Sequence, residues 1–243
     1  MTTITEPRVE LIAHTTIVPD AIEQRLEIQE GSTDAETLTV YAGRSCYESW
    51  SRPNEKTRED KDYLRRTLFE QGHMSILEHA SATFYLTGVS RALLAEITRH
   101  RHLSFSVRSQ RFVSEEDASI VIPPAARKSK ATVVYGTEDF RDDLDGSLTG
   151  ALKWWAQDVL LDYEEIVEAL QGEGLPRKQA REAARAVLPN MIETKIVVTG
   201  NMRAWHEVIE RRTAPDADAE FQQVAGMIRD ELQKLAPEVF PAP

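Results

Sequence analysis

Residues 99–111 read Arg-His-Arg-His-Leu-Ser-Phe-Ser-Val-Arg-Ser-Gln-Arg, with four arginines, two histidines, three serines and no acidic residue. The whole chain carries a formal net charge of -11 at pH 7, so this segment is a local exception. A guanidinium group can donate two parallel hydrogen bonds to two phosphate oxygens, and serine hydroxyls supply further hydrogen bonds. The segment therefore indicates a binding site for phosphate-bearing small molecules. The alternative is a solvated surface of ordinary ion pairs.

A helix is expected immediately before this segment. Ser90 is a typical N-cap, and an apolar stripe over residues 93–97 predicts a helix that brings Arg99 to its C-terminal end. Residues 80–87 favour a strand that Gly88 ends. The arginine- and serine-rich segment itself mixes β-branched, aromatic and polar residues, which indicates extended structure or a shaped loop.

The other elements are predicted from periodicity and from residues that begin or end helices. Strands are expected at 9–15 and 192–199, and helices at 34–47, 58–71, within 142–171, and at 178–188, 201–212 and 217–235. The helix within 142–171 is expected to bury Leu152, Trp155, Val159, Ile166 and Leu170. Without an internal repeat or a break in composition, we expect a single α+β domain over residues 1–243, helix-rich around a central antiparallel or mixed sheet.

Composition and charge narrow the class of protein. A chain of 243 residues with 41% hydrophobic and 28% charged residues is typical of a globular protein, and its acidic balance argues against broad binding to nucleic acid or anionic membranes. The single cysteine, Cys46, excludes an intramolecular disulfide and suits a reducing compartment. The N-terminus does not resemble a signal peptide, and no apolar run approaches the roughly 18 residues that span a bilayer. We therefore expect a cytoplasmic protein that binds neither nucleic acid nor membrane.

Two further groups of arginines could bind an anion. The first recurs every four residues on one helix face and consists of Arg177, Arg181 and Arg185. Glu173 and Glu182 lie close enough in sequence to neutralise it. The second follows the last predicted strand and consists of Asn201, Arg203, Arg211 and Arg212. Asn201 is expected to cap the following helix, while the arginines either face a ligand or pair with neighbouring glutamates.

The histidines and the cysteine match no metal or nucleophile motif. His100 and His102 are two residues apart, and neither a His-Glu-x-x-His pattern nor paired cysteines occur, so no metal site is expected. Only Arg44 is near enough in sequence to activate Cys46, which we interpret as a buried, small apolar residue. His73 follows a glycine at a predicted helix end, where it either caps the helix or contacts a ligand. A glycine-rich nucleotide loop is also lacking.

The arrangement Arg99-His100-Arg101, seven residues, then Ser109 resembles the signature of the flavin-dependent thymidylate synthases. Similarity to that family, in the same order, extends over the stretches 44–47, 72–79, 184–189 and 199–205, and spans roughly residues 8–240. The resemblance implies an α+β homotetramer with FAD in active sites where subunits meet. It implies synthesis of dTMP from dUMP, with 5,10-methylenetetrahydrofolate as carbon donor, NADPH as reductant and no cysteine nucleophile.

The resemblance also implies roles for individual residues. The implied dUMP ligands are Glu96, Arg99, Ser109, Gln110, Arg111, Arg185 and Arg212. Arg212 resembles the arginine that activates the uracil ring, with its neighbour Arg211 as the alternative. The implied FAD contacts are Ser75, Arg99, His100, Arg101, Asn201, Arg203 and Glu207. His73 is placed near the flavin, where folate or nicotinamide approaches.

Three positions depart from the family pattern. Val107 stands where relatives often carry Gln or Glu, Phe112 replaces a common tyrosine, and Pro215 lies in a loop where relatives have a polar segment with His. A relative that keeps the fold and has lost activity is therefore one alternative. The other is an RNA-binding module built on residues 99–111, against which stand the acidic net charge and the scarcity of aromatic residues there.

Overall fold

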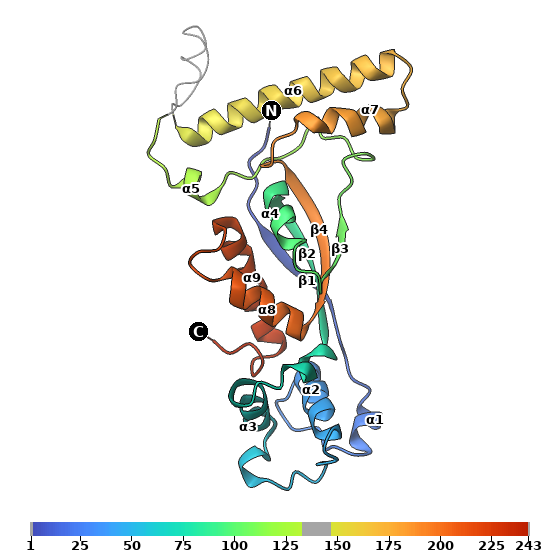
Figure 1. Ribbon diagram of the computed structural model, residues 1–243, viewed down its shortest axis with the longest axis vertical. Helices are drawn as coiled ribbons and strands as arrows, with labels where there is room; N and C mark the ends of the chain where they lie inside the picture. The colour runs from blue at the N-terminus through green and yellow to red at the C-terminus, as the bar shows by residue number, and fades with distance from the viewer. Residues whose placement is uncertain (1, 133–146, 243) are drawn as a thin grey trace.

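In the computed structural model, which describes residues 2–132 and 147–242, four strands form an antiparallel sheet with the order β1-β2-β4-β3. The strands are β1 (Arg8–His14), β2 (Ser81–Ser90), β3 (Ser104–Val107) and β4 (Glu193–Asn201). Along β2 and β4 buried residues alternate with half-buried ones, because one face of the sheet carries the core. The predicted helix-rich α+β fold with a central sheet is confirmed (Figure 1).

Gly88 does not end β2, and that prediction is wrong. The strand continues to Ser90, and its register against β4 shifts between Leu86 and Val89. Gly88 has φ +64°, and a Cβ there would lie 1.9 Å from the carbonyl oxygen of Glu6. The glycine therefore allows a bulge and a close approach of the N-terminal segment, where a side chain would not fit.

Three helices cover the core face of the sheet (Figure 1). They are α4 (Arg91–Ile97), α8 (Met202–Arg212) and α9 (Ala219–Leu235). The predicted caps are confirmed: the Ser90 hydroxyl accepts the amide of Leu93, and Asn201 Oδ1 accepts the amide of Ala204 at 2.8 Å. Trp205 packs edge-on against Phe84 in the same core, with ring centroids 5.2 Å apart. Each cap fixes the first residue of its helix and therefore also the position of the C-terminal ends of α4 and α8.

A group of short helices lies at one end of the sheet (Figure 1). It contains α1 (Pro19–Glu23), α2 (Asp34–Ser45), η1 (Glu55–Thr57), α3 (Asp60–Leu64), the π-helical η2 (Arg65–Glu70) and η3 (Met74–Glu78). The helix expected at 58–71 is therefore α3 continued by a π-helical segment, while the sequence does not predict α1 and η3. A buried ion pair between Arg52 and Asp60, 2.5 Å apart, ties the connecting loop to α3.

At the other end of the sheet, α6 (Leu148–Gly172) packs against α7 (Arg177–Ala184), with η5 (Arg185–Val187) and α5 (Pro124–Arg127) beside it (Figure 1). The buried side of α6 differs from the prediction and consists of Ala151, Ala156, Leu160 and Tyr163. Trp155 is 40% exposed, and the other four residues of the predicted stripe are only half-buried. The reason is that α6 packs mainly on α7 and contributes Ala156 and Leu160 to a small separate cluster, whereas the main core cluster contains no residue of α6. No helix within the described residues is long and apolar enough to cross a membrane.

Candidate functional site

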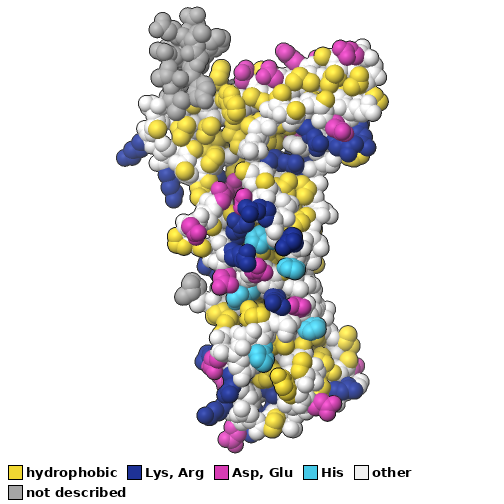
Figure 2. Space-filling view, viewed as in Figure 1, with side chains coloured by type: hydrophobic (Ala, Val, Ile, Leu, Met, Phe, Trp, Pro, Cys, Tyr) yellow, Lys and Arg dark blue, Asp and Glu magenta, His cyan; other side chains and the backbone are white. Residues whose placement is uncertain are grey.

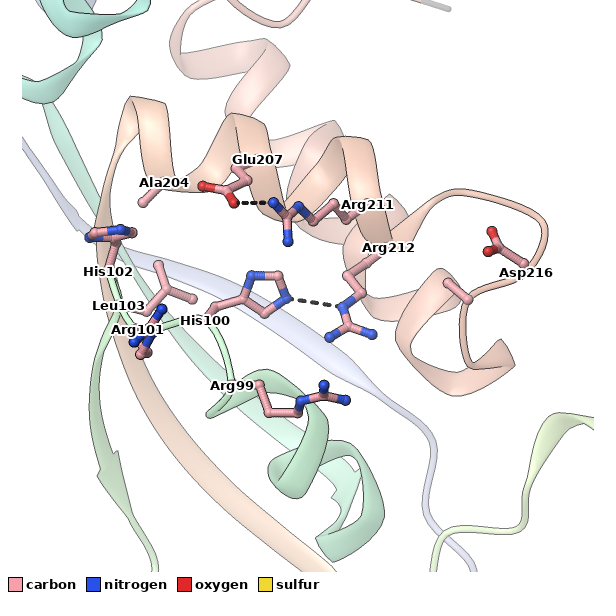
Figure 3. A pocket seen from close by; sticks show the side chains of 11 residues that line it. Arg99, His100, Arg101, His102, Leu103, Ala204, Glu207, Arg211, Arg212 and Asp216 are labelled. Carbon is pink, nitrogen blue, oxygen red and sulfur yellow. Dashed lines mark hydrogen bonds and ion pairs between the residues drawn. The ribbon is translucent and has the colours of Figure 1, made fainter.

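A cavity of about 490 Å³ lies between the end of α4, α8 and the start of α9 (Figure 3). It is lined by Arg99, His100, Arg101, His102, Leu103, Ala204, Glu207, Arg211, Arg212, Asp216 and Ala217. After α4 the chain makes two consecutive turns, in which the amides of His100 and Leu103 donate to the carbonyls of Ile97 and His100. These turns direct the signature residues into the cavity before β3 begins. Lys and Arg side chains and histidines gather on the same middle part of the molecule (Figure 2).

Arg212 is held on three sides in this cavity. Its Nε donates to His100 Nε2 at 3.0 Å (Figure 3). Its Nη1 donates to Glu96 Oε2, also at 3.0 Å. The carbon of its guanidinium lies 4.8 Å from the centroid of the Phe221 ring, within range of a cation–π contact. Arg212 is only 18% exposed, whereas Arg211 is 68% exposed and pairs with Glu207 at 2.8 Å. Of these two neighbours, Arg212 is therefore the one fixed inside the cavity.

His100 accepts a hydrogen bond from Arg212, so its Nε2 carries a lone pair and the ring is neutral in this arrangement. Burial lowers the pKa of His100, and the adjacent guanidinium of Arg212 lowers it further. Glu207 opposes this effect, while Arg211 and Arg99 add to it. Imidazole and guanidinium are thus matched as acceptor and donor near neutral pH.

A second cavity of about 240 Å³ adjoins the first. Glu78, Asn201 and Arg203 line it, together with His102, Ala204 and Glu207, which line both cavities. Arg203 forms an ion pair with Glu78 of η3. Six of the seven residues predicted to contact FAD (Arg99, His100, Arg101, Asn201, Arg203 and Glu207) therefore lie around two continuous hollows.

Ser109, Gln110 and Arg185 line a different hollow of about 560 Å³, open to solvent between α4, the end of β3 and η5. Arg111 does not line it; its Nε lies 2.6 Å from Glu182 Oε2 on α7. The predicted dUMP ligands thus form two sets in one chain. One set is Glu96, Arg99 and Arg212, and the other is Ser109, Gln110 and Arg185, with Arg111 apart from both.

The arginines of 99–111 have acidic partners that the local sequence does not show. Arg99 pairs with Glu96 at 3.7 Å, Arg108 with Glu115 at 3.3 Å and Arg111 with Glu182. Glu115 is buried, which raises the pKa of its carboxyl although Arg108 and Arg91 oppose the shift. Arg101 is the one arginine of the segment without an ion pair among the described residues. The alternative of ordinary ion pairs therefore holds for part of this segment.

Ser75 and His73 lie apart from these hollows, in a cavity of about 420 Å³ beside α2 and η2. Cys46 and Tyr47 line the same cavity, and Cys46 is exposed, so the prediction of a buried cysteine is wrong. The reason is that α2 ends at Ser45, and the thiol of Cys46 donates to the Ala42 carbonyl at 3.4 Å outside the core. The His73 amide donates to the Thr67 carbonyl at 2.9 Å and so closes the end of η2, while its side chain makes no cap at the start of η3. A ligand contact of this side chain stays a prediction.

Phe221 lies beside the site without a signal in the sequence, where it is one of several apolar residues on α9. Its position three residues after Asp218, the N-cap of α9, fixes it at the first turn beside the cavity.

No group of three or more His, Cys, Asp or Glu side chains suited to a metal ion occurs in residues 2–132 and 147–242.

Comparison with known proteins gives one consistent result. The family model described as thymidylate synthase complementing protein matches residues 28–238. A probable flavin-dependent thymidylate synthase of Mycobacterium phage L5 is 48% identical over 210 residues, covering 86% of this chain and 81% of that protein. The flavin-dependent thymidylate synthase of Mycobacteroides abscessus is 43% identical over 245 residues, covering 99% and 91%. The crystal structure of thymidylate synthase X from Helicobacter pylori with FAD and dUMP has the same fold, with a TM-score of 0.61, 21% identity and coverage of 98% and 100%.

Proposed function

This chain belongs to the family of flavin-dependent thymidylate synthases, and we propose that it binds FAD and converts dUMP to dTMP. In this proposal 5,10-methylenetetrahydrofolate donates the carbon and NADPH supplies the reducing equivalents. The observation that carries the proposal is Arg212, held in one orientation in a cavity that the signature residues Arg99, His100 and Arg101 line. An RNA-binding surface would not need a half-buried guanidinium held by three contacts.

Arg212 would activate the pyrimidine. Its fixed positive charge stabilises negative charge at N3 and O2 of the uracil ring, because a preorganised cation needs no rearrangement when that charge develops. Its Nη2 has no hydrogen-bond partner among the described residues and is free to donate to the substrate. Arg99, which is largely exposed, and Arg111 would bind the phosphate through paired hydrogen bonds, and Arg185 would be a further contact to dUMP.

The residues present fit FAD. Arg101 is exposed and without an ion pair in the described part of the chain, and it suits the pyrophosphate charge. Glu207, where the two hollows meet, offers acceptors for hydroxyl groups, and Asn201 in the second hollow offers its amide NH2 as a donor, since its Oδ1 caps α8. We assign the cofactor to Ser75, Arg99, His100, Arg101, Asn201, Arg203 and Glu207, with His73 near the flavin. When bound, the flavin supplies the hydride that completes the new methyl group.

Two features support the finer parts of the proposal. Among the described residues the Cys46 thiol forms a hydrogen bond with the Ala42 carbonyl and with no basic side chain that could activate it, which supports chemistry without a cysteine nucleophile. The predicted dUMP ligands fall into two sets around different hollows, which supports a homotetramer whose active sites combine residues of neighbouring subunits.

The proposal is tested anaerobically with the purified protein. Its visible spectrum is recorded, and NADPH, dUMP and methylenetetrahydrofolate are then added and dTMP is assayed. A flavin band that bleaches with NADPH, followed by dTMP, is expected. Flavin binding without dTMP would favour a degenerate relative, and Val107 would be the first position to revert. A colourless protein that takes up no added FAD would overturn the proposal.

Arg212→Ala is expected to abolish dTMP formation while FAD remains bound, because the substitution removes the cation aimed at the pyrimidine and leaves Arg99, Arg101 and Arg203 in place. Arg211→Ala is the matched control, since that side chain is exposed and pairs only with Glu207 in the described structure. Comparable loss in both variants would show that the assignment to Arg212 is wrong.

A further inference from the structure

Phe221 has no part in the function described so far, yet it lies directly behind the reactive arginine. It is fully buried at the first turn of α9, where its amide donates to the N-cap Asp218 at 3.0 Å. Its ring faces the guanidinium of Arg212 at 4.8 Å and meets the His100 ring edge-on, with centroids 5.9 Å apart. One aromatic side chain therefore contacts both members of the Arg212–His100 hydrogen bond.

The contacts of Arg212 leave its Nη2 without a hydrogen-bond partner among the described residues. His100 accepts the Nε hydrogen, Glu96 accepts one from Nη1, and the guanidinium carbon lies over the Phe221 ring, 4.8 Å from its centroid. The two hydrogen bonds fix Nε and Nη1, and the Phe221 ring is a third contact that opposes movement of the guanidinium. An arginine side chain otherwise has many rotamers, and holding it before the substrate arrives removes that entropy cost from the reaction.

We propose that Phe221 is a positioning residue for the conversion of dUMP: its ring holds the Arg212 guanidinium in position, so that Nη2 is presented to the pyrimidine. This inference rests on the function proposed above. The interaction requires an aromatic face, because the electrostatic attraction of a cation to the ring quadrupole is lost when an aliphatic side chain fills the same volume. The charged and titratable groups that share this environment are Glu96, Arg99, His100, Glu207 and Arg211.

The test is Phe221→Leu in the FAD-loaded full chain. We expect kcat/KM for dUMP to fall by roughly threefold to thirtyfold, the range that a cation–π contact supplies. Binding of dUMP, measured by equilibrium dialysis without NADPH or folate, is expected to weaken by a similar factor. The FAD content is expected to stay unchanged. If Phe221→Leu does not fold, Phe221→Met takes its place, since it also lacks an aromatic face.

Phe84→Leu is the matched control. Phe84 is as deeply buried in the same core, but its aromatic partner is Trp205, and it makes no contact with Arg212. This variant is expected to lose stability and to keep its affinity for dUMP. Equal losses of dUMP affinity in the Phe84 and Phe221 variants would overturn the proposal, because both would then act through general packing.

A double-mutant cycle separates positioning from structure. In the Arg212→Ala background, Phe221→Leu is expected to have no further effect on dUMP binding. A full additional loss there, or wild-type affinity and kcat/KM in Phe221→Leu alone, would contradict the role of Phe221. Failure of the wild-type protein to form dTMP would instead contradict the proposed function, and the binding cycle would still report on the ring.

Discussion

At the scale of single residues, the sequence nominates Arg211 and Arg212 together, and the helix phase separates them. Trp205 and Val208, seven and four residues before Arg212, are buried on the core side of α8. Arg212 continues that stripe and therefore points inward, whereas Arg211 points to solvent. The apolar pattern of α8 contains this information. By contrast, the partners Glu96, His100 and Phe221 come from other elements, and no local pattern predicts them.

The contact between His100 and Arg212 predicts an acid limb in the pH profile. Below its pKa the imidazolium of His100 no longer accepts the Arg212 Nε hydrogen and repels the guanidinium, so kcat/KM for dUMP should fall. Burial and Arg212 lower this pKa, which places the fall below the ordinary histidine value of about 6.5. His100→Gln retains an acceptor that does not titrate and is expected to remove this limb, measured as pH–rate profiles with FAD content as a check.

His206→Gln serves as the control for the pH profile. Burial lowers the pKa of His206 too, but its ring lies near those of Phe69 and Phe240, tilted and with centroids 6.2 Å from each, and does not line the Arg212 cavity. Both histidines bind protons less readily in the folded chain, so the stability they contribute is present above about pH 6.5 and is lost as pH falls through their folded pKa. An acid limb that persists in His100→Gln and vanishes in His206→Gln would contradict the assignment.

Cys46→Ala is expected to leave dTMP formation within about twofold of wild type, because an exposed side chain outside the core has little influence on stability. Its thiol donates only to the carbonyl of Ala42, and it lies in a different cavity from Arg212. Initial rates of dTMP formation and the melting temperature provide the measurement. A variant that folds, binds FAD and is inactive would instead favour a nucleophilic role for the thiol.

At the scale of elements, strong periodicity and capping residues are sufficient for most of the core. The strands β1, β2 and β4 and the helices α2, α4, α8 and α9 lie where the sequence predicts them. The failures have physical causes outside the local sequence. The buried side of α6 is set by the helix that packs on it, and the bulge at Gly88 depends on the approach of the chain at Glu6.

Gly88→Ala tests that approach. At φ +64° an alanine is conformationally strained. Its Cβ would also lie 1.9 Å from the carbonyl oxygen of Glu6, and the backbone would have to move to relieve this clash. Gly31→Ala is the matched control, since Gly31 also has a positive φ (+86°) and nothing lies within 4 Å of the position that a Cβ would take there. In urea unfolding we expect a loss of about 1–2 kcal/mol for Gly31→Ala and at least about 3 kcal/mol for Gly88→Ala. Equal losses of stability in the two variants would show that the backbone at Glu6 moves aside at no cost in free energy.

At the scale of the whole molecule, the signature residues are close in sequence but surround different hollows. Arg99, His100 and Arg101 line the cavity of Arg212, while Ser109, only eight residues later, lies with Arg185 beyond β3. The strand between them carries the chain from one hollow to the other. The residues of the candidate site could therefore be nominated from the sequence, but their division into two sets depends on the sheet and could not.

This division leads to a prediction about assembly. If each active site combines Arg212 from one subunit with Arg185 from another, Arg212→Ala, expected to be inactive, and Arg185→Ala, expected to need a higher dUMP concentration, should complement each other at low dUMP. When the two variants are mixed in equal amounts and allowed to exchange subunits, we expect up to about one quarter of wild-type activity to return. In random assemblies, about one quarter of the sites take Arg212 from a subunit with an intact Arg212 and Arg185 from a neighbour with an intact Arg185. The measurement is the rate of dTMP formation before and after exchange, with the size of the assembly determined by light scattering. Mixing Arg212→Ala with Arg212→Lys is the control, since neither subunit then supplies the intact residue. If subunits exchange and the mixture is still no more active than its components, the proposed sharing is wrong. Either Arg185 and Arg212 of one subunit then serve the same active site, or Arg185 is not part of the active site.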